Sequence, residues 1–257
     1  MRLLISGTTS GLGRHLHETL GGIGWNRDLP ADERARLRRE GVDVIVHCAW
    51  KPPPRTTADH LYPYLGDTLL LTQDLLAVPH RKFVFLSTNE VYPPGPGLRR
   101  EEEPIEVDAV RGIYGMTKIM AESIVRQCSP NHLILRSAGL LGPYARKNVV
   151  RRILEDDPCE LTLAAESRFN YMLHADVGQF LRMAIDSDLT GLYNMASAEG
   201  VSLAELAAMF GRRVRFGTYR YPMSELDNGK IAAIFPAFRK TSRTVIEQFA
   251  AQTGISP

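Results

Sequence analysis

The sequence predicts an α/β protein built on a doubly wound, Rossmann-like parallel sheet, with a small C-terminal subdomain. Three observations lead to this prediction: short apolar runs, helical stretches that alternate with them, and a glycine-rich turn directly after the first run. Apolar runs of this kind are typical of parallel strands that are buried on both faces. Alternating strands and helices with polar connections indicate a parallel sheet. The 257 residues fit one large domain.

The first strand is expected over Arg2–Ile5, and it leads through a glycine turn into a helix that includes Arg14–Leu20. This order is the context that a dinucleotide-binding turn requires. Gly7 permits the tight turn, Gly11 lets backbone N–H groups approach a pyrophosphate, and Gly13 lets helix and strand pack closely. An ordinary strand-to-helix turn also uses glycine. The predicted cofactor-binding residues of this turn are Gly7, Ser10, Gly11, Leu12 and Gly13.

Further buried strands are expected along the chain, with helical stretches between them. The strand runs are 42–49, 83–88 and 132–136, and the most regular helical stretches are 68–77 and 117–127. Ligands of doubly wound sheets bind at the carboxyl ends of the strands. Ala49 and Thr88 stand at two such ends, so we expect Ala49 near the cofactor and Thr88 near a substrate.

Tyr114 and Lys118 are four residues apart in a predicted helix, and Glu122 follows at the same interval. Residues at this spacing project from one face of a helix, so the Lys118 ammonium can stand beside the Tyr114 phenol. A neighbouring cation lowers the pKa of a phenol from its usual value of about 10. Such a tyrosine can exchange a proton with a substrate oxygen. Solvated Tyr and Lys side chains on a surface helix are the alternative.

The chain resembles the short-chain dehydrogenase/reductase superfamily, and specifically its extended branch of nucleotide-sugar epimerases, dehydratases and reductases. Each matching segment is modest alone, but their joint order along almost the whole chain is specific. The segments are the glycine turn, Asp43–Ala49, Phe85–Tyr92, Tyr114–Lys118 with Glu122, Leu135–Pro143, Arg168–Tyr171 with Asp176 and Val177, Gly191–Met195 and Leu226–Lys230.

The resemblance implies one extended short-chain dehydrogenase-like domain over residues 1–257. Its Rossmann core would span about 1–142 plus 172–197, and a substrate-side subdomain about 143–171 plus 198–257. Tyr114 would be the general acid/base, Lys118 would lower its pKa and hold the nicotinamide ribose, and Thr88 would polarise the substrate oxygen. Thr88 could equally be an ordinary residue at a strand end. The turn departs from the extended branch, which usually has glycine where Ser10 stands.

The choice of cofactor depends on the residues after the second strand. An NAD enzyme normally ends this strand with an acidic residue that binds the ribose hydroxyls. Asn26 occupies roughly that position here, and Arg27 beside it could pair with a 2′-phosphate. NADP is therefore preferred over NAD. In the competing interpretation, Asp28 and Leu29 contact the adenine and Arg27 is a solvated loop residue.

Three further residues are candidates for the substrate site by resemblance. Glu90 matches a Glu that removes a proton in the family's 4,6-dehydratases, although it could be a structural carboxylate. Asn89 stands where one dehydratase subgroup has Asp, and an amide cannot deliver a proton. Arg168 precedes Phe-Asn-Tyr in a segment where family members place an Arg against the nucleotide diphosphate. A salt bridge to a nearby Glu is the alternative for Arg168.

The segment from Tyr144 to Ser167, which should cover the substrate, is short for an epimerase. It is closer in length to compact members such as the dTDP-4-keto-rhamnose reductases. We therefore expect an NAD(P)-dependent reductase of a nucleotide-linked keto-sugar. The alternatives are an epimerase or dehydratase that recycles its NAD internally, and a non-catalytic NAD(P)-binding sensor or scaffold.

Composition limits the partners and the compartment. A net charge of +2 does not favour a nucleic-acid surface, and no apolar stretch approaches the length of a membrane span. The scattered Cys48, Cys128 and Cys159 suit a reducing cytoplasm and lack metal-ligand spacing, so no metal is expected. The resemblance also implies a homodimer through a four-helix bundle. Residues Ile119, Met120, Ile124 and Val125 would supply its apolar surface.

Overall fold

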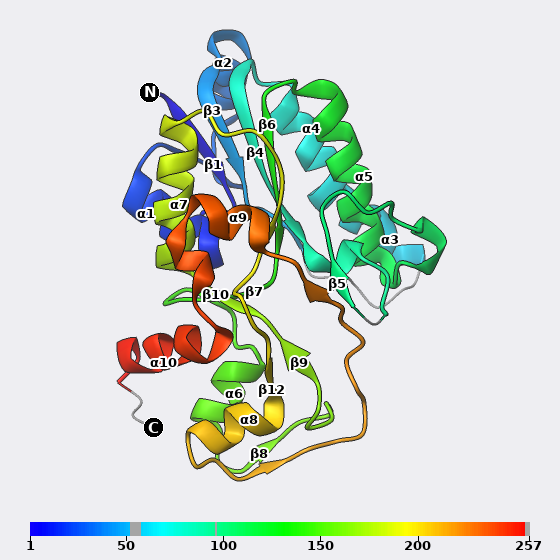
Figure 1. Cartoon of the computed structure of the whole chain (residues 1–257). Coiled ribbons are helices and arrows are strands. Elements are labelled where there is room, and N and C mark those ends of the chain that lie inside the picture. The colour runs from blue at the N-terminus through cyan, green and yellow to red at the C-terminus, as the bar shows by residue number, and fades with distance from the viewer. Residues whose placement is uncertain (52–57, 96, 255–257) are drawn as a thin grey trace.

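The computed structural model describes residues 1–51, 58–95 and 97–254. Its centre is a six-stranded sheet in the order β11-β6-β4-β3-β1-β2, and every neighbouring pair is parallel (Figure 1). The predicted doubly wound parallel sheet is therefore confirmed. The strands are β1 (Leu3–Ser6), β2 (Ile23–Trp25), β3 (Val42–His47), β4 (His80–Thr88), β6 (His132–Ser137) and β11 (Gly191–Met195).

Helices cover both faces of the sheet, and alternate strand residues point to opposite faces. Leu3 and Ile5 of β1 belong to one buried apolar cluster, whereas Leu4 between them belongs to another. The first face carries α1 (Gly11–Leu20), α7 (His174–Asp186), α9 (Gly229–Ile234) and the 3₁₀ turn η4 (Pro236–Arg239). The opposite face carries α2 (Ala31–Glu40), α4 (Leu71–Leu76) and α5 (Gly112–Cys128).

Two predicted helices have different bounds in the structure. The stretch 68–77 consists of α4 preceded by a π-helical turn, η1 (Gly66–Leu70), which continues from α3 (Ala58–Leu65). The stretch 117–127 is part of α5, which begins five residues earlier at Gly112. Tyr114 therefore lies in the first turn of this helix, next to the sheet edge where the strands end.

Besides the two clusters on the faces of the sheet, a further apolar cluster lies beyond the carboxyl ends of the strands (Figure 1). We call this region the second layer. Its helices are α6 (Val149–Glu155), α8 (Leu203–Met209) and α10 (Ser242–Gln252), and its principal strands are β7 (Gly139–Leu141) and β10 (Tyr171–Leu173). Short strands complete this region or join it to the site: β5 (Leu98–Arg99), β8 (Cys159–Glu160), β9 (Arg168–Phe169), β12 (Val201–Ser202), β13 (Val214–Arg215) and β14 (Glu225–Leu226).

The sheet and the second layer are not separated by a single boundary in the sequence. Ile231 and Phe238 pack in a cluster on the sheet, whereas Val245 and Phe249 pack in the second layer. The C-terminal residues thus return to the Rossmann face before entering the second layer. The division into a core and a substrate-side subdomain stays a prediction. Among the described residues, no helix is long and apolar enough to cross a membrane.

A buried ion pair joins α5 to the sheet. Both carboxylate oxygens of Glu122 accept hydrogen bonds from Arg136 of β6, at 3.1 and 2.9 Å. Ser87 of β4 donates to the same carboxylate at 2.6 Å. Arg136 also donates to Tyr92 at 2.8 Å, and the Tyr92 hydroxyl donates to Asn194 of β11. One polar network therefore fixes the helix across three strands.

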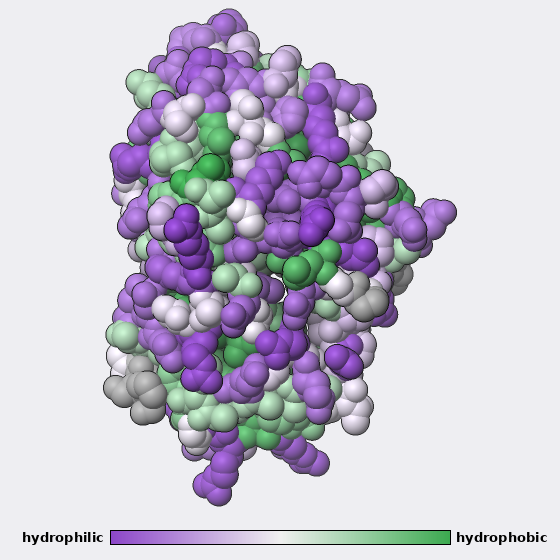
Figure 2. Space-filling model, in the orientation of Figure 1, coloured by the Kyte–Doolittle hydropathy of each residue, from purple (hydrophilic) through white to green (hydrophobic). Residues whose placement is uncertain are grey.

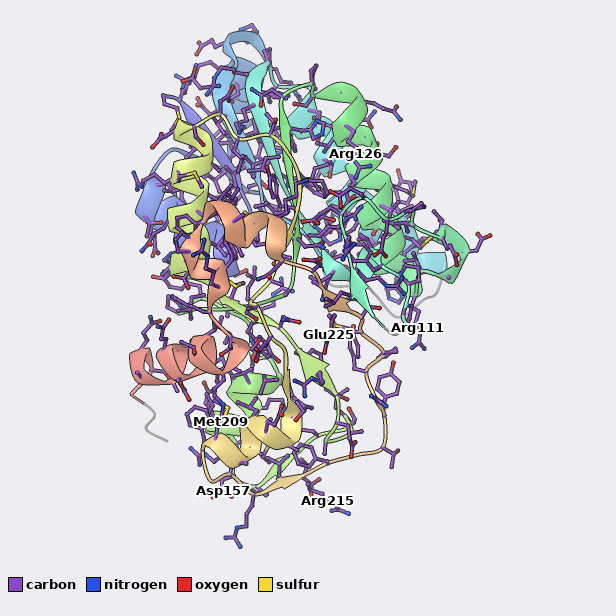
Figure 3. All side chains as sticks on the ribbon, viewed as in Figure 1. Arg111, Arg126, Asp157, Met209, Arg215 and Glu225 are labelled. Atoms are coloured by element: carbon purple, nitrogen blue, oxygen red, sulfur yellow. The ribbon has the colours of Figure 1, made fainter. Side chains whose placement is uncertain are left out.

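Replacing Arg136 with Met should leave the Glu122 carboxylate buried without its main partner. We expect the free energy of unfolding to fall by about 3–5 kcal/mol, the usual cost of breaking a buried pair. Arg126→Met is the matched control, because Arg126 pairs with the same carboxylate from the solvent side and is 44% exposed (Figure 3). In that control the free energy of unfolding should fall by about 1 kcal/mol or less. Equal small losses in urea denaturation would contradict a stabilising network.

Candidate functional site

The candidate site begins where β4 ends and α5 starts. Thr88, the last residue of β4, is buried, and its side chain interacts with the Tyr114 phenol. Thr88 also caps the 3₁₀ turn η2 (Asn89–Val91), because its hydroxyl accepts the backbone N–H of Glu90 at 3.2 Å. The structure thus brings together two hydroxyls that the sequence predicts to act on one substrate oxygen. Their catalytic roles stay a prediction.

Gly115 explains how the start of α5 comes so close to η2. A Cβ at this position would lie 2.4 Å from the Glu90 carbonyl oxygen and 2.8 Å from a Val110 methyl carbon. Neither distance is possible, so only glycine fits without moving the backbone. This close packing places Tyr114, the preceding residue, against Thr88 and Glu90.

The electrostatics of Tyr114 differ from the prediction. Burial and, next, the Glu90 carboxylate raise the pKa of the phenol, while the hydrogen bond with Thr88 and the Arg146 guanidinium act in the opposite direction. The sequence predicts a pKa lowered by Lys118, and the structure gives a raised one. Burial is the main cause, and Lys118 does not oppose it because its ammonium contacts Leu86 and Trp50 instead of the phenol.

Lys118 is 3% exposed. Its ammonium donates a hydrogen bond to the Leu86 carbonyl of β4 and lies 3.9 Å from the centre of the Trp50 ring. Burial lowers the pKa of this ammonium to about 7, although the nearby Cys48 and Glu122 favour its charged form. At neutral pH the side chain is therefore close to its own titration midpoint.

Glu90 faces a residue that the sequence analysis did not identify. Burial raises the pKa of Glu90, and a hydrogen bond with the Tyr221 phenol opposes this shift. Tyr221 lies between β13 and β14, where its backbone N–H donates to Ser167 at 3.1 Å and its ring packs on Phe169. Two residues later, Met223 accepts a hydrogen bond from Asn89, at 3.8 Å. This segment therefore borders the site from the second layer.

Tyr221 could not be found from a local pattern. It lies more than a hundred residues from Glu90 in sequence, in an irregular segment without periodicity. Arg146 was missed for the same reason, because its position near Tyr114 depends on how residues 142–148 fold back over the sheet edge. The nearest available signal was the tyrosine-rich stretch 219–221, which has no fixed meaning by itself.

The glycine turn packs the start of α1 closely against the sheet. Gly7 has φ +78° and a Cβ there would lie 2.8 Å from the Ala49 nitrogen, and a Cβ at Gly13 would lie 2.4 Å from the Gly7 carbonyl oxygen. Gly11 has φ +58° and open space around its Cβ position. Its N–H, at the start of α1, donates to the Tyr144 carbonyl at 2.8 Å. These residues fit a dinucleotide at the helix N-terminus.

The other predicted residues of this turn have separate positions. Ser10 precedes α1, is exposed and makes no side-chain cap. Leu12 is buried in the sheet cluster, so its side chain contributes packing and not a ligand contact. Ala49 donates its N–H to Ser6 at 3.1 Å and lies against Gly7. The turn, Ala49 and the start of α1 thus form one corner of the sheet.

The residues after β2 form a polar rim beside this corner. Asn26 donates to Thr8 at 3.3 Å and accepts the N–H of Asp28 at 2.9 Å. The Arg27 side chain is 82% exposed and pairs with Asp67 at 3.2 Å. Lys51 pairs with the same Asp67 carboxylate at 2.5 Å. Leu29 packs partly buried against the sheet cluster of the opposite face.

Arg168 forms the ion pairs that the alternative interpretation describes. It lies 3.2 Å from Glu205 and 3.8 Å from Glu225, and it donates to the Gly200 carbonyl at 2.7 Å. Its contact with a substrate phosphate stays a prediction. Among the described residues, no group of three or more potential ligands could hold a metal ion.

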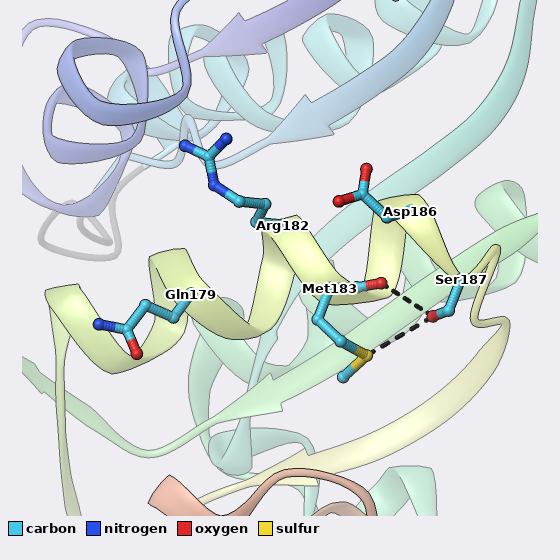
Figure 4. Close-up of a pocket in the computed structure, with 5 residues that line it drawn as sticks. All are labelled: Gln179, Arg182, Met183, Asp186 and Ser187. Atoms are coloured by element: carbon cyan, nitrogen blue, oxygen red, sulfur yellow. Dashed lines mark hydrogen bonds between the residues drawn. The ribbon is translucent and has the colours of Figure 1, made fainter.

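The surface view shows polar side chains over most of one face, with smaller apolar areas between them (Figure 2). A shallow depression lies on α7 and is lined by Gln179, Arg182, Met183, Asp186 and Ser187 (Figure 4). None of the predicted site residues lines it. The candidate site is therefore defined by its side-chain contacts and not by this depression.

The fold and the glycine corner define a nucleotide-binding α/β protein, and comparison with known proteins identifies its family. A family model described as the NAD dependent epimerase/dehydratase family matches residues 3–196. The chain belongs to this family, which confirms the resemblance predicted from the sequence motifs. Its members are NAD-dependent enzymes, in agreement with the predicted enzyme class and with the prediction of NADP or NAD.

A relative in sequence is the L-arabinose 1-dehydrogenase (NAD(P)(+)) of Haloferax volcanii. It is 26% identical over 194 residues, which cover 68% of this chain and 75% of that protein. A solved dTDP-4-dehydrorhamnose reductase from Clostridium acetobutylicum is similar in structure, with a TM-score of 0.82, 17% identity and coverage of 99% and 100% of the two chains.

UDP-glucuronic acid 4-epimerase from Bacillus cereus, solved with UDP-glucuronic acid and NAD, gives a TM-score of 0.78 at 19% identity. The match covers 98% of this chain and 100% of that chain. At these identities the structural matches show the shared fold alone.

Proposed function

We propose that this protein is an NAD(P)-dependent oxidoreductase that reduces a keto-sugar linked to a nucleotide. The observation that carries the proposal is the proximity of the Thr88 and Tyr114 hydroxyls at the end of β4. Both hydroxyls can contact one carbonyl oxygen. The glycine corner that fits a dinucleotide lies at the same carboxyl edge of the sheet, where ligands of such folds bind.

Each residue then has a defined task. Tyr114 donates its phenolic proton to the substrate carbonyl oxygen, and Thr88 donates a hydrogen bond that polarises the same oxygen. The raised pKa of Tyr114 keeps the phenol protonated at neutral pH, which is the state from which reduction starts. Gly7, Gly11 and Gly13 would hold the dinucleotide, which supplies hydride when bound. Lys118 would contact its ribose.

Glu90 and Tyr221 would bind sugar hydroxyls opposite this pair. Burial raises the pKa of Glu90, and the Tyr221 phenol is its partner. The solved epimerase and reductase named above support a nucleotide-linked sugar. An epimerase or dehydratase with internally recycled NAD remains an alternative, as does a non-catalytic sensor or scaffold.

A second candidate is a dehydrogenase of free sugars. It is favoured by the name of the sequence relative, which is an L-arabinose dehydrogenase. It is also favoured by Arg168, whose guanidinium is already engaged by two carboxylates and a carbonyl. If Arg168 keeps these partners, only its remaining N–H groups can contact a phosphate. Parallel assays of nucleotide-linked keto-sugars with NADPH and of free aldoses with NADP⁺ would distinguish the two candidates.

The Tyr114→Phe variant tests the proton transfer. It removes only the phenolic oxygen, so turnover should fall by about 10² to 10⁴-fold, the usual contribution of a positioned acid. Cofactor affinity should remain almost unchanged. Tyr219→Phe is the matched control, because Tyr219 is near the site segment but 48% exposed. Steady-state kinetics on an identified substrate measures both, and near-normal turnover of Tyr114→Phe would favour the sensor.

We also propose that NADP is preferred over NAD through the cations at the polar rim. Arg27 and Lys51 come from different loops and converge on the Asp67 carboxylate. A 2′-phosphate is an anion of higher charge that can replace this carboxylate as their partner.

Replacing Arg27 with Ala should weaken NADPH binding by about 1.5–3 kcal/mol, the contribution of a hydrogen bond to a charged group. NADH binding should hardly change, because NADH has no 2′-phosphate. Arg38→Ala provides the control, since Arg38 of α2 pairs with Asp74 of α4 outside this rim. Calorimetric titration measures the affinities of the wild type and both variants for NADPH and NADH. Equal losses for both cofactors would show that Arg27 is structural.

We propose further that the protein is a homodimer through α5 and the adjacent helices. Of the four residues predicted to supply the interface, Val125 is fully buried in the sheet cluster, so that part of the prediction is wrong. Met120 is 51% exposed. Tyr62 and Leu70, at 81% and 51%, are exposed on α3 and η1, and η1 packs beside α5. Apolar side chains of this size favour burial against a partner.

Light scattering at micromolar concentration should therefore give twice the mass of one chain. Met120→Glu should produce monomers, because it places a charge in the proposed interface. Ile234→Glu changes a comparably exposed apolar residue on α9 and should leave the dimer intact. A monomeric wild-type protein would exclude this assembly.

A further inference from the structure

Trp50 lies at a position to which the proposed function gives no role. It follows Ala49 at the end of β3, and its indole packs against the Phe85 ring of β4, with centroids 5.8 Å apart. The Lys118 ammonium lies 3.9 Å from the centre of the Trp50 ring and 4.7 Å from that of Phe85. With the Leu86 carbonyl as hydrogen-bond acceptor, two aromatic faces and one oxygen surround the charge.

Hydrogen bonds tie the indole to the helix that carries Lys118. The Trp50 Nε1–H donates to the Tyr64 hydroxyl at 3.4 Å, and that hydroxyl is 3.1 Å from the Thr117 hydroxyl. Thr117, directly before Lys118, donates in turn to the Ile113 carbonyl at 2.8 Å. The ring therefore cannot turn away without breaking this chain of bonds. Trp50 and Lys118 are held to one another from both sides.

We propose that Trp50 is a positioning residue, whose indole, together with Phe85, holds the Lys118 ammonium in place and stabilises its charge. A cation is attracted to the face of an aromatic ring within about 6 Å, and the attraction grows when water is excluded. This inference rests on the proposed role of Lys118 at the cofactor. It adds a residue through which that role is maintained.

Several titratable groups surround this ammonium. From β3, burial lowers the pKa of His47 to about 3 and, just after the strand, raises that of Cys48 to about 12. On α5 itself, Glu122 is paired with Arg136, and the pKa of Tyr114 is raised. Tyr64 approaches from α3 through Thr117. Lys118 itself has a pKa near 7, so its charge changes around neutrality.

Tryptophan fluorescence provides a test that needs neither substrate nor cofactor. The chain has two tryptophans, and the other, Trp25, is buried beside Arg34. The difference between wild type and Trp50→Phe gives the emission of Trp50. We expect this emission to change with pH around 7, because the charge at the ring face changes, and to be flat in Lys118→Met. A flat wild-type profile, or a titration that persists in Lys118→Met, would overturn the proposal.

The second measurement is the pH dependence of NADPH affinity, followed by nicotinamide fluorescence. In Trp50→Leu the aromatic face is lost, the ammonium is less favoured, and affinity should start to fall at a pH lower by about one unit. Trp50→Phe keeps an aromatic ring and should stay nearer to wild type. Leu and Phe variants with the same profile would contradict the proposal.

Circular dichroism checks the fold of each variant. If Trp50→Leu does not fold, the emission measurements on Trp50→Phe and Lys118→Met still test the proposed contact between Trp50 and Lys118. A protein that turns over no sugar would refute the proposed function and would leave the fluorescence result unaffected. The two failures are therefore distinguishable.

Discussion

The buried pair of Glu122 and Arg136 constrains the rest of the molecule. Removing two charges from water is costly, and the cost is tolerable only when hydrogen bonds satisfy both groups. Here Ser87 of β4 and Arg136 of β6 both donate to one carboxylate of α5, and Arg136 also donates to Tyr92. The helix can satisfy all of them in only one register. That register determines where its first turn meets the end of β4.

The same requirement explains the composition of the buried face of α5. Its buried residues include Gly115, Thr117, Lys118 and Glu122 beside Ala121 and Val125. Gly115 lets the helix approach η2, and the two charged residues bind groups of the sheet. The buried face of α5 therefore has little apolar area. The pairing with Arg136 and the contact of Lys118 with Trp50 replace apolar packing at these places.

The sequence could predict those features that depend on local pattern. Buried parallel strands such as β3 and β4 are continuous apolar runs. The glycines of the first turn are required by the backbone geometry of a few neighbouring residues. Tyr114 and Lys118 were recognisable from their spacing and their place in the motif order. Family membership followed from that order. Each of these signals is contained in a short segment.

The remaining features depend on contacts between distant segments. Val125 has the same apolar character as Met120, and only the packing of α5 shows that one faces the sheet and the other solvent. Tyr221 reaches Glu90 through an irregular segment of the second layer. The expected effect of Lys118 on Tyr114 also failed for this reason. Helical spacing predicts that two side chains share a face, but not which neighbour a flexible ammonium selects.

Burial shifts the pKa values of Tyr114 and Lys118 in opposite directions, and each shift suits the role proposed for that residue. It raises the pKa of the phenol and lowers that of the ammonium, because it disfavours the charged form of each group. The phenol therefore remains a proton donor at neutral pH, as the proposed reduction requires. The ammonium would lose its charge unless its surroundings compensate, and the Leu86 carbonyl, Glu122 and the faces of Trp50 and Phe85 are the groups placed to do so. The same burial that keeps the Tyr114 phenol protonated disfavours the Lys118 ammonium, so the ammonium needs these local contacts. This explains why an aromatic residue stands where β3 leaves the sheet.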